Sequence, residues 1–178
     1  IRSTLWARAA STVSLASTSP AVASSRCSRS GLMVSRSQPA RSVICVVLRK
    51  LAEARGVSVE FRHLDLQGWQ WPEAEFDAAV AVFIQFAPPA FRDEIFAGLK
   101  RTVRPGGVLL LHGYTPKQLE YGTGGPRVVE QLYTEELLRA AFADWELLRI
   151  EAYERDLDEG AGHKGRSAII DLVARRPS

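Results

Sequence analysis

Two nearly unbroken apolar runs flank an amphipathic pattern, and this arrangement constrains the fold more than any other feature of the chain. Residues 76–84 (FDAAVAVFI) and 108–111 (VLLL) have the composition of strands that are buried on both faces of a parallel sheet. Between the two runs, apolar residues recur every four positions and form one stripe along a helix: Phe91, Ile95, Leu99 and Val103. A strand, a crossover helix and a second strand predict that the two strands pair in parallel.

The same alternation extends on both sides of this unit. A helical pattern over 46–56 precedes a short alternating strand over 57–61, and Thr134 is the expected N-cap of a further helix. Two strand patterns, 145–153 and 167–175, then follow each other without a helical pattern between them. We therefore predict an α/β fold, a Rossmann-like, doubly wound and mostly parallel sheet with helices on both faces, closed by an antiparallel hairpin.

The first 52 residues differ in composition from the rest. They contain no Asp or Glu, carry eight of the 23 basic residues, and are dominated by Ser, Ala and Arg without a sustained period. Such a segment offers few bulky side chains to offset the entropy cost of ordering, so we expect residues 1–42 to lack a conventional packed element. The chain accordingly divides into a basic Ser/Arg/Ala-rich segment, 1–45, and an α/β domain, 46–178.

Three interpretations of the segment 1–45 stay open. An Arg-rich, Ser-rich and acid-poor composition is typical of an organellar transit peptide, and it also suits a disordered basic tail. We favour a third interpretation, a fragment or an out-of-frame translation of a GC-rich gene, because such genes yield Arg, Ser, Ala and Pro. The chain opens with Ile1 rather than Met, as expected for an incomplete or misassigned start.

Charge and rare residues exclude several functional classes. Outside the first 52 residues the chain carries 15 basic and 20 acidic side chains, so its pI of about 9.1 reflects the N-terminal segment and does not predict nucleic-acid binding. Cys27 and Cys45 form no CxxC motif and the three histidines lack metal-like spacing, so we predict no metal site, no disulfide framework and a cytoplasmic location. No apolar run reaches the roughly 18 residues of a membrane helix.

Several motifs occur in a fixed order within the α/β part. Phe76-Asp77 opens the first apolar run, the text LKRTVRPGGVLLL spans 99–111, and Asp65-Leu66 follows the short strand over 57–61. Over about residues 46–176, this ordered set resembles the class I S-adenosylmethionine-dependent methyltransferases. The loop texts FIQFAPP, GYTP, YGTGGP and GAGH are similar to the tellurite-resistance and thiopurine-type branch of that family.

The resemblance implies S-adenosylmethionine as the cofactor and assigns its binding residues to the carboxyl edge of the sheet. Asp65 and Leu66 correspond to the residues that bracket the adenine, although an Asp in such a loop also caps loops or helices. The end of the fourth family strand, Val82, Phe83 and Ile84, is expected to contact the cofactor, although core packing explains these residue types equally well. On the substrate side we place Gln85, Tyr114 and Tyr121, for which loop solvation or ordinary packing are the alternatives.

One half of the family's cofactor site has no counterpart in the sequence. The family's first strand ends in a glycine-rich loop and its second strand ends in an acidic residue, but the only glycine before Glu53 is Gly31, and no carboxylate precedes Glu53. We therefore expect a domain that is incomplete at its N-terminal end. The text GAGHKG over 160–165 matches G-x-G-x-x-G by spelling, but it joins two strands, so we interpret it as a flexible hairpin connection.

These observations predict a methyltransferase that acts on a small-molecule acceptor, either a thiol or a chalcogen oxyanion. A soft acceptor needs no strong general base, so no catalytic residue is assigned, and His112, which follows the fifth family strand, is the one histidine near the cleft. One alternative is a catalytically inactive, truncated fragment that binds no cofactor. The other is a Rossmann-type oxidoreductase, against which the closing hairpin and the missing dinucleotide turn argue. The sequence predicts no oligomeric state.

Overall fold

The main structural unit is a mixed sheet of four strands. A computed structural model of the chain describes residues 9–10, 31–35, 50, 53–56, 58–158 and 164–178. The sheet contains β4 (Phe76–Val82), β5 (Val103–Tyr114), β7 (Lys164–Arg175) and β6 (Glu146–Asp158), in that spatial order. β4 and β5 are parallel, and β7 is antiparallel to both β5 and β6. The predicted parallel pair and the closing antiparallel hairpin are therefore confirmed.

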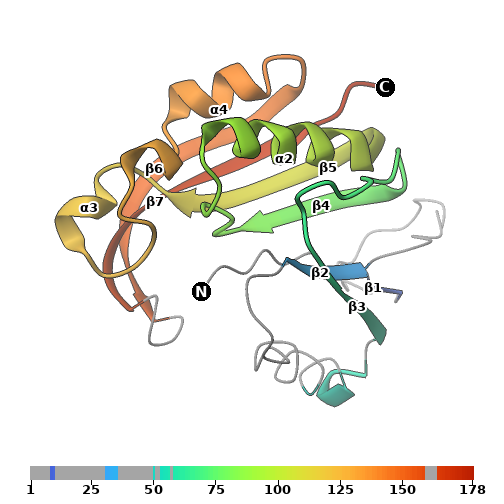
Figure 1. Cartoon of the computed structure of the whole chain (residues 1–178), viewed down its shortest axis with the longest axis horizontal. Coiled ribbons are helices and arrows are strands. Elements are labelled where there is room, and N and C mark those ends of the chain that lie inside the picture. Colours follow the sequence, from blue (N-terminus) through green and yellow to red (C-terminus); the bar gives the residue numbers. More distant parts are fainter. Residues whose placement is uncertain (1–8, 11–30, 36–49, 51–52, 57, 159–163) are drawn as a thin grey trace, which may run out of the picture.

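Two helices cover one face of this sheet (Figure 1). They are α2 (Pro89–Thr102), which has a proline in its first turn, and α4 (Glu135–Ala141), whose N-cap Thr134 accepts a hydrogen bond from the Leu137 N–H at 3.2 Å. We expected helices on both faces, but α2 and α4 share one. The reason is that the chain moves across the sheet in one direction, from β4 to β5 to β6, and right-handed crossovers then place both helices on the same side.

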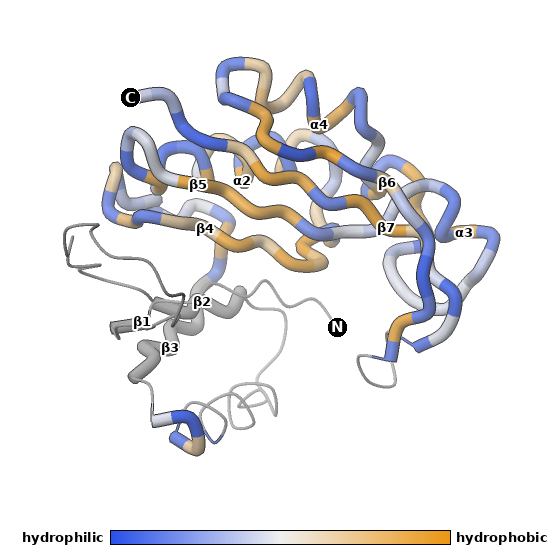
Figure 2. The backbone as a smooth tube through the Cα atoms, turned by 180° about the vertical axis from the view of Figure 1, so that it is seen from behind, coloured by the Kyte–Doolittle hydropathy of each residue, from blue (hydrophilic) through white to orange (hydrophobic). Residues whose placement is uncertain are grey.

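The hydrophobic core lies between these helices and the sheet. Alternate residues of β4 and β5 point into it, and Ala79, Ala81, Leu109 and Leu111 are at most 2% exposed. Val80 and Leu110, which point to the other face, are 41% and 39% exposed. The hydropathy colouring in Figure 2 shows the apolar character of these central strands from behind. The apolar runs of the sequence thus build a core on one face of the sheet only.

The two edges of the four-stranded sheet differ in charge. β6 carries seven charged residues among its 13, whereas β4 carries only Asp77 among its seven. Charged side chains on an edge strand discourage pairing with a further strand. β6 therefore has the composition of a protected edge, and β4 has the composition of an interior strand.

A separate three-stranded sheet contains the strand that we expected over 57–61. This strand, β3 (Ser58–Leu64), pairs in parallel with β2 (Gly31–Ser35) and antiparallel with β1 (Ala9–Ala10). The five strands expected after residue 57 are present, but β3 is hydrogen-bonded to this second sheet and not to β4. We did not predict β1 and β2 in the basic segment. A strand can be held by backbone hydrogen bonds to a distant strand without an alternating apolar pattern in its own sequence.

Other expectations fall largely outside the described residues. In the helix predicted over 46–56, the described residues Lys50, Glu53 and Ala54 are helical, and Gly56 has the left-handed φ of +63° that suits a helix end. Most of segment 1–45 and the loop 159–163 lie outside the described residues. Among the helices of the described part, none is long and apolar enough to cross a membrane.

Arg176, just after β7, caps the carboxyl end of α2. Its guanidinium donates hydrogen bonds to the carbonyl oxygens of Lys100, Arg101 and Val103, at 3.3, 3.3 and 2.5 Å. The last carbonyls of a helix lack intrahelical partners and carry partial negative charge. A cation there therefore donates hydrogen bonds to these carbonyls and offsets their charge.

We expect Arg176→Ala to lower the free energy of unfolding by about 1–3 kcal/mol, because charged hydrogen bonds to helix carbonyls are lost. Arg175→Ala is the matched control, since Arg175 forms only an exposed ion pair with Glu146 and such pairs contribute about 0–1 kcal/mol. Urea unfolding of both variants measures the difference. Equal destabilisation by the two substitutions would contradict the capping role.

Candidate functional site

The carboxyl ends of the parallel strands β4 and β5 lie side by side, at the sheet edge where open α/β sheets bind ligands. Val82, the last residue of β4, pairs with His112 of β5. The next residue, Phe83, has a left-handed φ of 49°, which is uncommon for a bulky side chain, and its N–H donates to the His112 carbonyl at 2.9 Å. Such strained backbone is concentrated at binding sites, so this turn marks the candidate site.

The Phe83 ring lies between two side chains of β5. It stacks on Tyr114 with ring centroids 4.6 Å apart, and it meets His112 edge-on at 4.7 Å. Tyr114 is only 1% exposed and belongs to a second core cluster with Leu132, Leu157 and Ile169. The structure thus brings together Val82, Phe83 and Tyr114, three of the residues that we assigned to the cofactor and the substrate.

Gln85 joins the end of β4 to the backbone of β5. Its side chain is buried, its Oε1 accepts from the Tyr114 N–H at 2.6 Å, and its Nε2 donates to the carbonyls of Tyr114 at 2.7 Å and Gln131 at 3.2 Å. A buried amide needs such partners, and here backbone groups supply them. The substrate-side role of Gln85 stays a prediction, and in this structure its amide holds the two strand ends together.

A polar cluster lies next to Phe83, on the sheet face opposite the helices. His112 Nδ1 is 2.6 Å from Asp171 Oδ1, and the Tyr153 hydroxyl donates to Asp171 Oδ2 at 2.8 Å. Burial and the hydrogen bond to Asp171 raise the pKa of Tyr153 above its ordinary value. We did not single out Asp171 or Tyr153 from the sequence. The sequence does contain an indication of this cluster: Asp171 interrupts the apolar residues AIIDLVA, and a carboxylate in such a strand needs a hydrogen-bonding partner.

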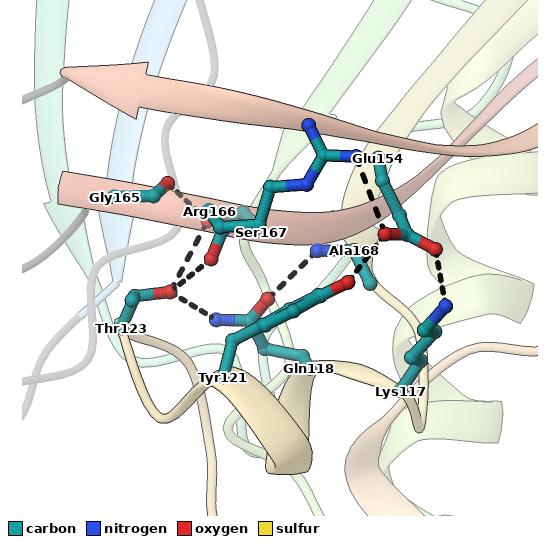
Figure 3. A network of polar contacts seen from close by, with 9 residues as sticks. All are labelled: Lys117, Gln118, Tyr121, Thr123, Glu154, Gly165, Arg166, Ser167 and Ala168. Atoms are coloured by element: carbon teal, nitrogen blue, oxygen red, sulfur yellow. Dashed lines mark hydrogen bonds and ion pairs between the residues drawn. The ribbon is translucent and has the colours of Figure 1, made fainter.

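Tyr121 belongs to a different network, on the hairpin formed by β6 and β7 (Figure 3). It ends the short helix α3 (Gln118–Tyr121), and its hydroxyl donates to Glu154, whose carboxylate also bonds Lys117 Nζ at 2.5 Å and Arg166 at 3.4 Å. The adjacent Gln118 accepts from the Ala168 N–H and donates to Thr123 Oγ1, both at 2.9 Å. These bonds hold the loop after β5 against the hairpin, and no described contact joins Tyr121 to the Phe83 turn.

The Glu154 network makes stability depend on pH. The hydrogen bonds from Lys117 and then Tyr121 lower the pKa of Glu154 from 4.5 to about 2, so its ionised form stabilises the fold above pH 4.5 and this contribution disappears as the pH falls toward 2. We expect Glu154→Gln to destabilise the protein at pH 7 and to differ little from the unchanged chain near pH 2. Urea unfolding at both pH values tests this, with the exposed Glu120→Gln as the control. A difference between variant and unchanged chain that persists at low pH would contradict it.

Asp65 and Leu66 follow β3 in a tight turn. Asp65 is exposed, and its Oδ1 accepts from the Gln67 N–H at 3.1 Å, so the carboxylate caps its own loop. Leu66 and Ile84 are 3% and 2% exposed and belong to the same core cluster. Their contact with a cofactor stays a prediction, as does that of Asp65. No group of His, Cys, Asp and Glu in the described part of the chain has metal-binding geometry.

A groove of about 570 Å³ lies between α2 and α4. Its two cations are already engaged. Lys100 pairs with Asp144 and donates to the Ala141 carbonyl, and Arg92 donates to the Glu130 carbonyl and pairs with Asp93. This groove therefore offers no uncommitted cation to a ligand, and the candidate site is the Phe83 turn.

Comparisons with known proteins agree with this fold. No protein-family model matches the chain, and no curated protein matches it in sequence. Among solved structures, a SAM-dependent methyltransferase from Methanosarcina mazei is 16% identical with a TM-score of 0.52, over 67% of this chain and 68% of that one. TehB from Haemophilus influenzae is 17% identical with a TM-score of 0.57, over 76% of this chain and 47% of that one.

The cyclase SpnF is 20% identical with a TM-score of 0.52, over 76% of this chain and 63% of its own. The chain thus spans between 47% and 68% of the length of these three proteins. Because the identities are low and one neighbour is a cyclase, the likeness concerns the fold and not the reaction. The described core of the chain is the β4-β5-β7-β6 sheet with its parallel pair and closing hairpin, and the chain has the fold of the class I S-adenosylmethionine-dependent methyltransferases.

Proposed function

We propose that the chain is a S-adenosylmethionine-dependent methyltransferase domain, incomplete at its N-terminal end, that acts on a small-molecule acceptor of thiol or chalcogen-oxyanion type in the cytoplasm. The observation that carries this proposal is the strained Phe83 turn at the carboxyl ends of β4 and β5. Ligands of open α/β sheets bind at this edge, and the fold neighbours include methyltransferases. The cofactor supplies a methyl group on a sulfonium sulfur.

The described residues fit the adenine end of the cofactor. Asp65 is exposed and presents a carboxylate that can accept a hydrogen bond from an exocyclic amine, although one oxygen already bonds Gln67. Val82 and Phe83 are half-buried and offer apolar surface at the end of β4, while Leu66 and Ile84 support them from the core. We assign these five residues to cofactor binding, and Gln85, Tyr114 and Tyr121 to the side of the acceptor.

A second candidate is a catalytically inactive fragment that binds no cofactor. Two observations favour it. The first 52 residues contain neither a glycine-rich loop nor a carboxylate, and β4 forms an edge of its sheet among the described strands despite its interior-strand composition. The two candidates make opposite predictions about product formation.

The test is incubation of the full chain with millimolar S-adenosylmethionine and one acceptor at a time: 2-mercaptoethanol, selenite with a reductant, or tellurite with a reductant. Mass spectrometry measures S-adenosylhomocysteine and the methylated acceptor. We expect both products with at least one acceptor and neither without protein. Their absence with all three acceptors would support the inactive fragment, and products from an amine alone would contradict the acceptor class.

A further inference from the structure

The cluster of His112, Asp171 and Tyr153 joins three neighbouring strands. Asp171 of β7 pairs in register with His112 of β5 on one side and with Glu151 of β6 on the other. The side chains of His112 and Asp171 are 19% and 26% exposed, so the pair is partly shielded but still reachable from solvent. Partly buried polar groups are costly unless they are hydrogen-bonded, and these two are hydrogen-bonded to each other.

The hydrogen bonds fix the tautomer of His112. An ionised carboxylate only accepts hydrogen bonds, and Asp171 accepts from the Tyr153 hydroxyl at 2.8 Å and from His112 at 2.6 Å. The proton of the neutral imidazole must therefore sit on Nδ1, which leaves the Nε2 lone pair as an acceptor. In the part of the chain that the structure describes, no hydrogen bond occupies Nε2.

The position of His112 links this lone pair to the candidate site. The residue pairs with Val82, and its ring is 4.7 Å from that of Phe83, so it lies at the strand ends where we place the cofactor and the acceptor. The charged groups around the cluster come from β6: Arg149, Glu151 and Arg155. β4 contributes only apolar side chains beside the ring.

We propose that His112, oriented by Asp171 and Tyr153, is the catalytic base that accepts the proton of a neutral thiol acceptor. This inference rests on the proposed function and narrows its acceptor to thiols. In the step, His112 Nε2 takes the proton of the S–H group while the thiol sulfur forms a bond to the methyl carbon. The bond between that carbon and the sulfonium sulfur breaks, and its electron pair stays on the cofactor sulfur. Asp171 then stabilises the imidazolium.

The chemistry explains why a thiol needs this base. A free thiol has a pKa of about 8.5 and is largely protonated at pH 7, so its sulfur gains nucleophilicity when the lone pair of a neutral imidazole accepts its proton. A chalcogen oxyanion already carries its negative charge and gains nothing from a base. The Phe83 ring, which meets His112 edge-on and stacks on Tyr114, supplies apolar surface beside the transfer.

The orientation is tested on the chain itself, without cofactor. Long-range ¹H–¹⁵N correlation spectra at pH 8 are expected to show His112 protonated on Nδ1 and unprotonated on Nε2. Asp171→Asn leaves one side-chain oxygen, which accepts from the Tyr153 hydroxyl, and an amide N–H that faces His112 Nδ1. Because Nδ1 must then accept a hydrogen bond, we expect the His112 proton to move to Nε2. Adding Tyr153→Phe removes the competing donor and is expected to restore the Nδ1 tautomer. A proton on Nε2 in the unchanged chain would overturn the inference.

The catalytic role is tested by methyl transfer to two thiols at millimolar S-adenosylmethionine. With 2-mercaptoethanol at pH 7 we expect His112→Gln to lower kcat/KM about 100-fold, and the loss to shrink as the thiol ionises above about pH 9. With benzenethiol, whose aromatic ring makes it largely a thiolate at pH 7, the loss should be small. Equal rates for variant and unchanged chain overturn the inference but leave the proposed function standing. Absence of product from the unchanged chain defeats the proposed function, and this inference with it.

Discussion

Titration of S-adenosylmethionine into the chain is expected to give a dissociation constant of about 1 mM or weaker. We assign Asp65 and Phe83 to the adenine end, but the family resemblance assigns the methionine end and the ribose hydroxyls to a glycine-rich loop and a carboxylate. The first 52 residues contain a single glycine, Gly31, and no carboxylate. Each lost hydrogen bond to a charged group costs about 1.5–3 kcal/mol, so two such losses weaken binding by a hundredfold or more.

A chimera tests the same reasoning in the opposite direction. We expect a family-type first strand, glycine-rich loop and acidic second strand, placed ahead of Lys50, to restore a dissociation constant of about 1–10 μM. The control is the same chimera with valines in place of the loop glycines, because side chains there block the close approach of the backbone. Isothermal titration calorimetry measures all three proteins. Micromolar binding by the unchanged chain would mean that the basic segment itself builds a cofactor site.

Gln85→Leu is expected to lower the free energy of unfolding by about 2–4 kcal/mol, although the substitution nearly preserves side-chain volume. The buried N–H of Tyr114 loses the Gln85 acceptor at 2.6 Å, and the carbonyls of Tyr114 and Gln131 lose a donor. Buried backbone groups that lose their partners carry the full desolvation penalty. Chemical unfolding followed by tryptophan fluorescence measures the loss.

Gln131→Leu is the matched control, because its amide makes one long hydrogen bond, 3.4 Å, to the Phe86 carbonyl. We expect it to cost less than about 1 kcal/mol. Gln85→Glu keeps the acceptor but turns a carboxylate oxygen toward the carbonyls of Tyr114 and Gln131, so it should destabilise the protein at least as much as Gln85→Leu. If Gln85→Leu leaves stability unchanged but weakens acceptor binding, then Gln85 acts on the substrate, and its hydrogen bonds to the backbone of Tyr114 and Gln131 do not stabilise the fold.

The sequence predicted those parts of the fold that depend on local patterns. The apolar runs became β4 and β5, and Thr134 caps α4 as expected. The Arg-Pro-Gly-Gly text, predicted as a turn before the strand, lies inside β5 at an irregularity of its register with β4, and its Gly106 takes a left-handed φ of +72°. Each of these features is decided within a few residues, so composition and period are sufficient to find it.

The parts that were missed depend on distant contacts. The pairing of β3 with β2 rather than with the main sheet joins segments whose own patterns do not specify a partner. The polar cluster joins His112 to Asp171 across 59 positions of sequence, and Tyr153 to Asp171 across 18. A sequence shows that His112 and Asp171 each need a partner, but only the register of β5 and β7 shows that they meet each other.

The contrast between the two edges of the main sheet bears on how this domain can be completed. β6, with its seven charges, ends the sheet, whereas β4 has the composition of a strand that another strand should adjoin. Strand addition depends on backbone hydrogen bonds and not on a covalent link. A separate peptide that carries a family-type first strand and its glycine-rich loop is therefore expected to dock beside β4. Cofactor binding would then measure the association of the two pieces in a split-protein complementation assay.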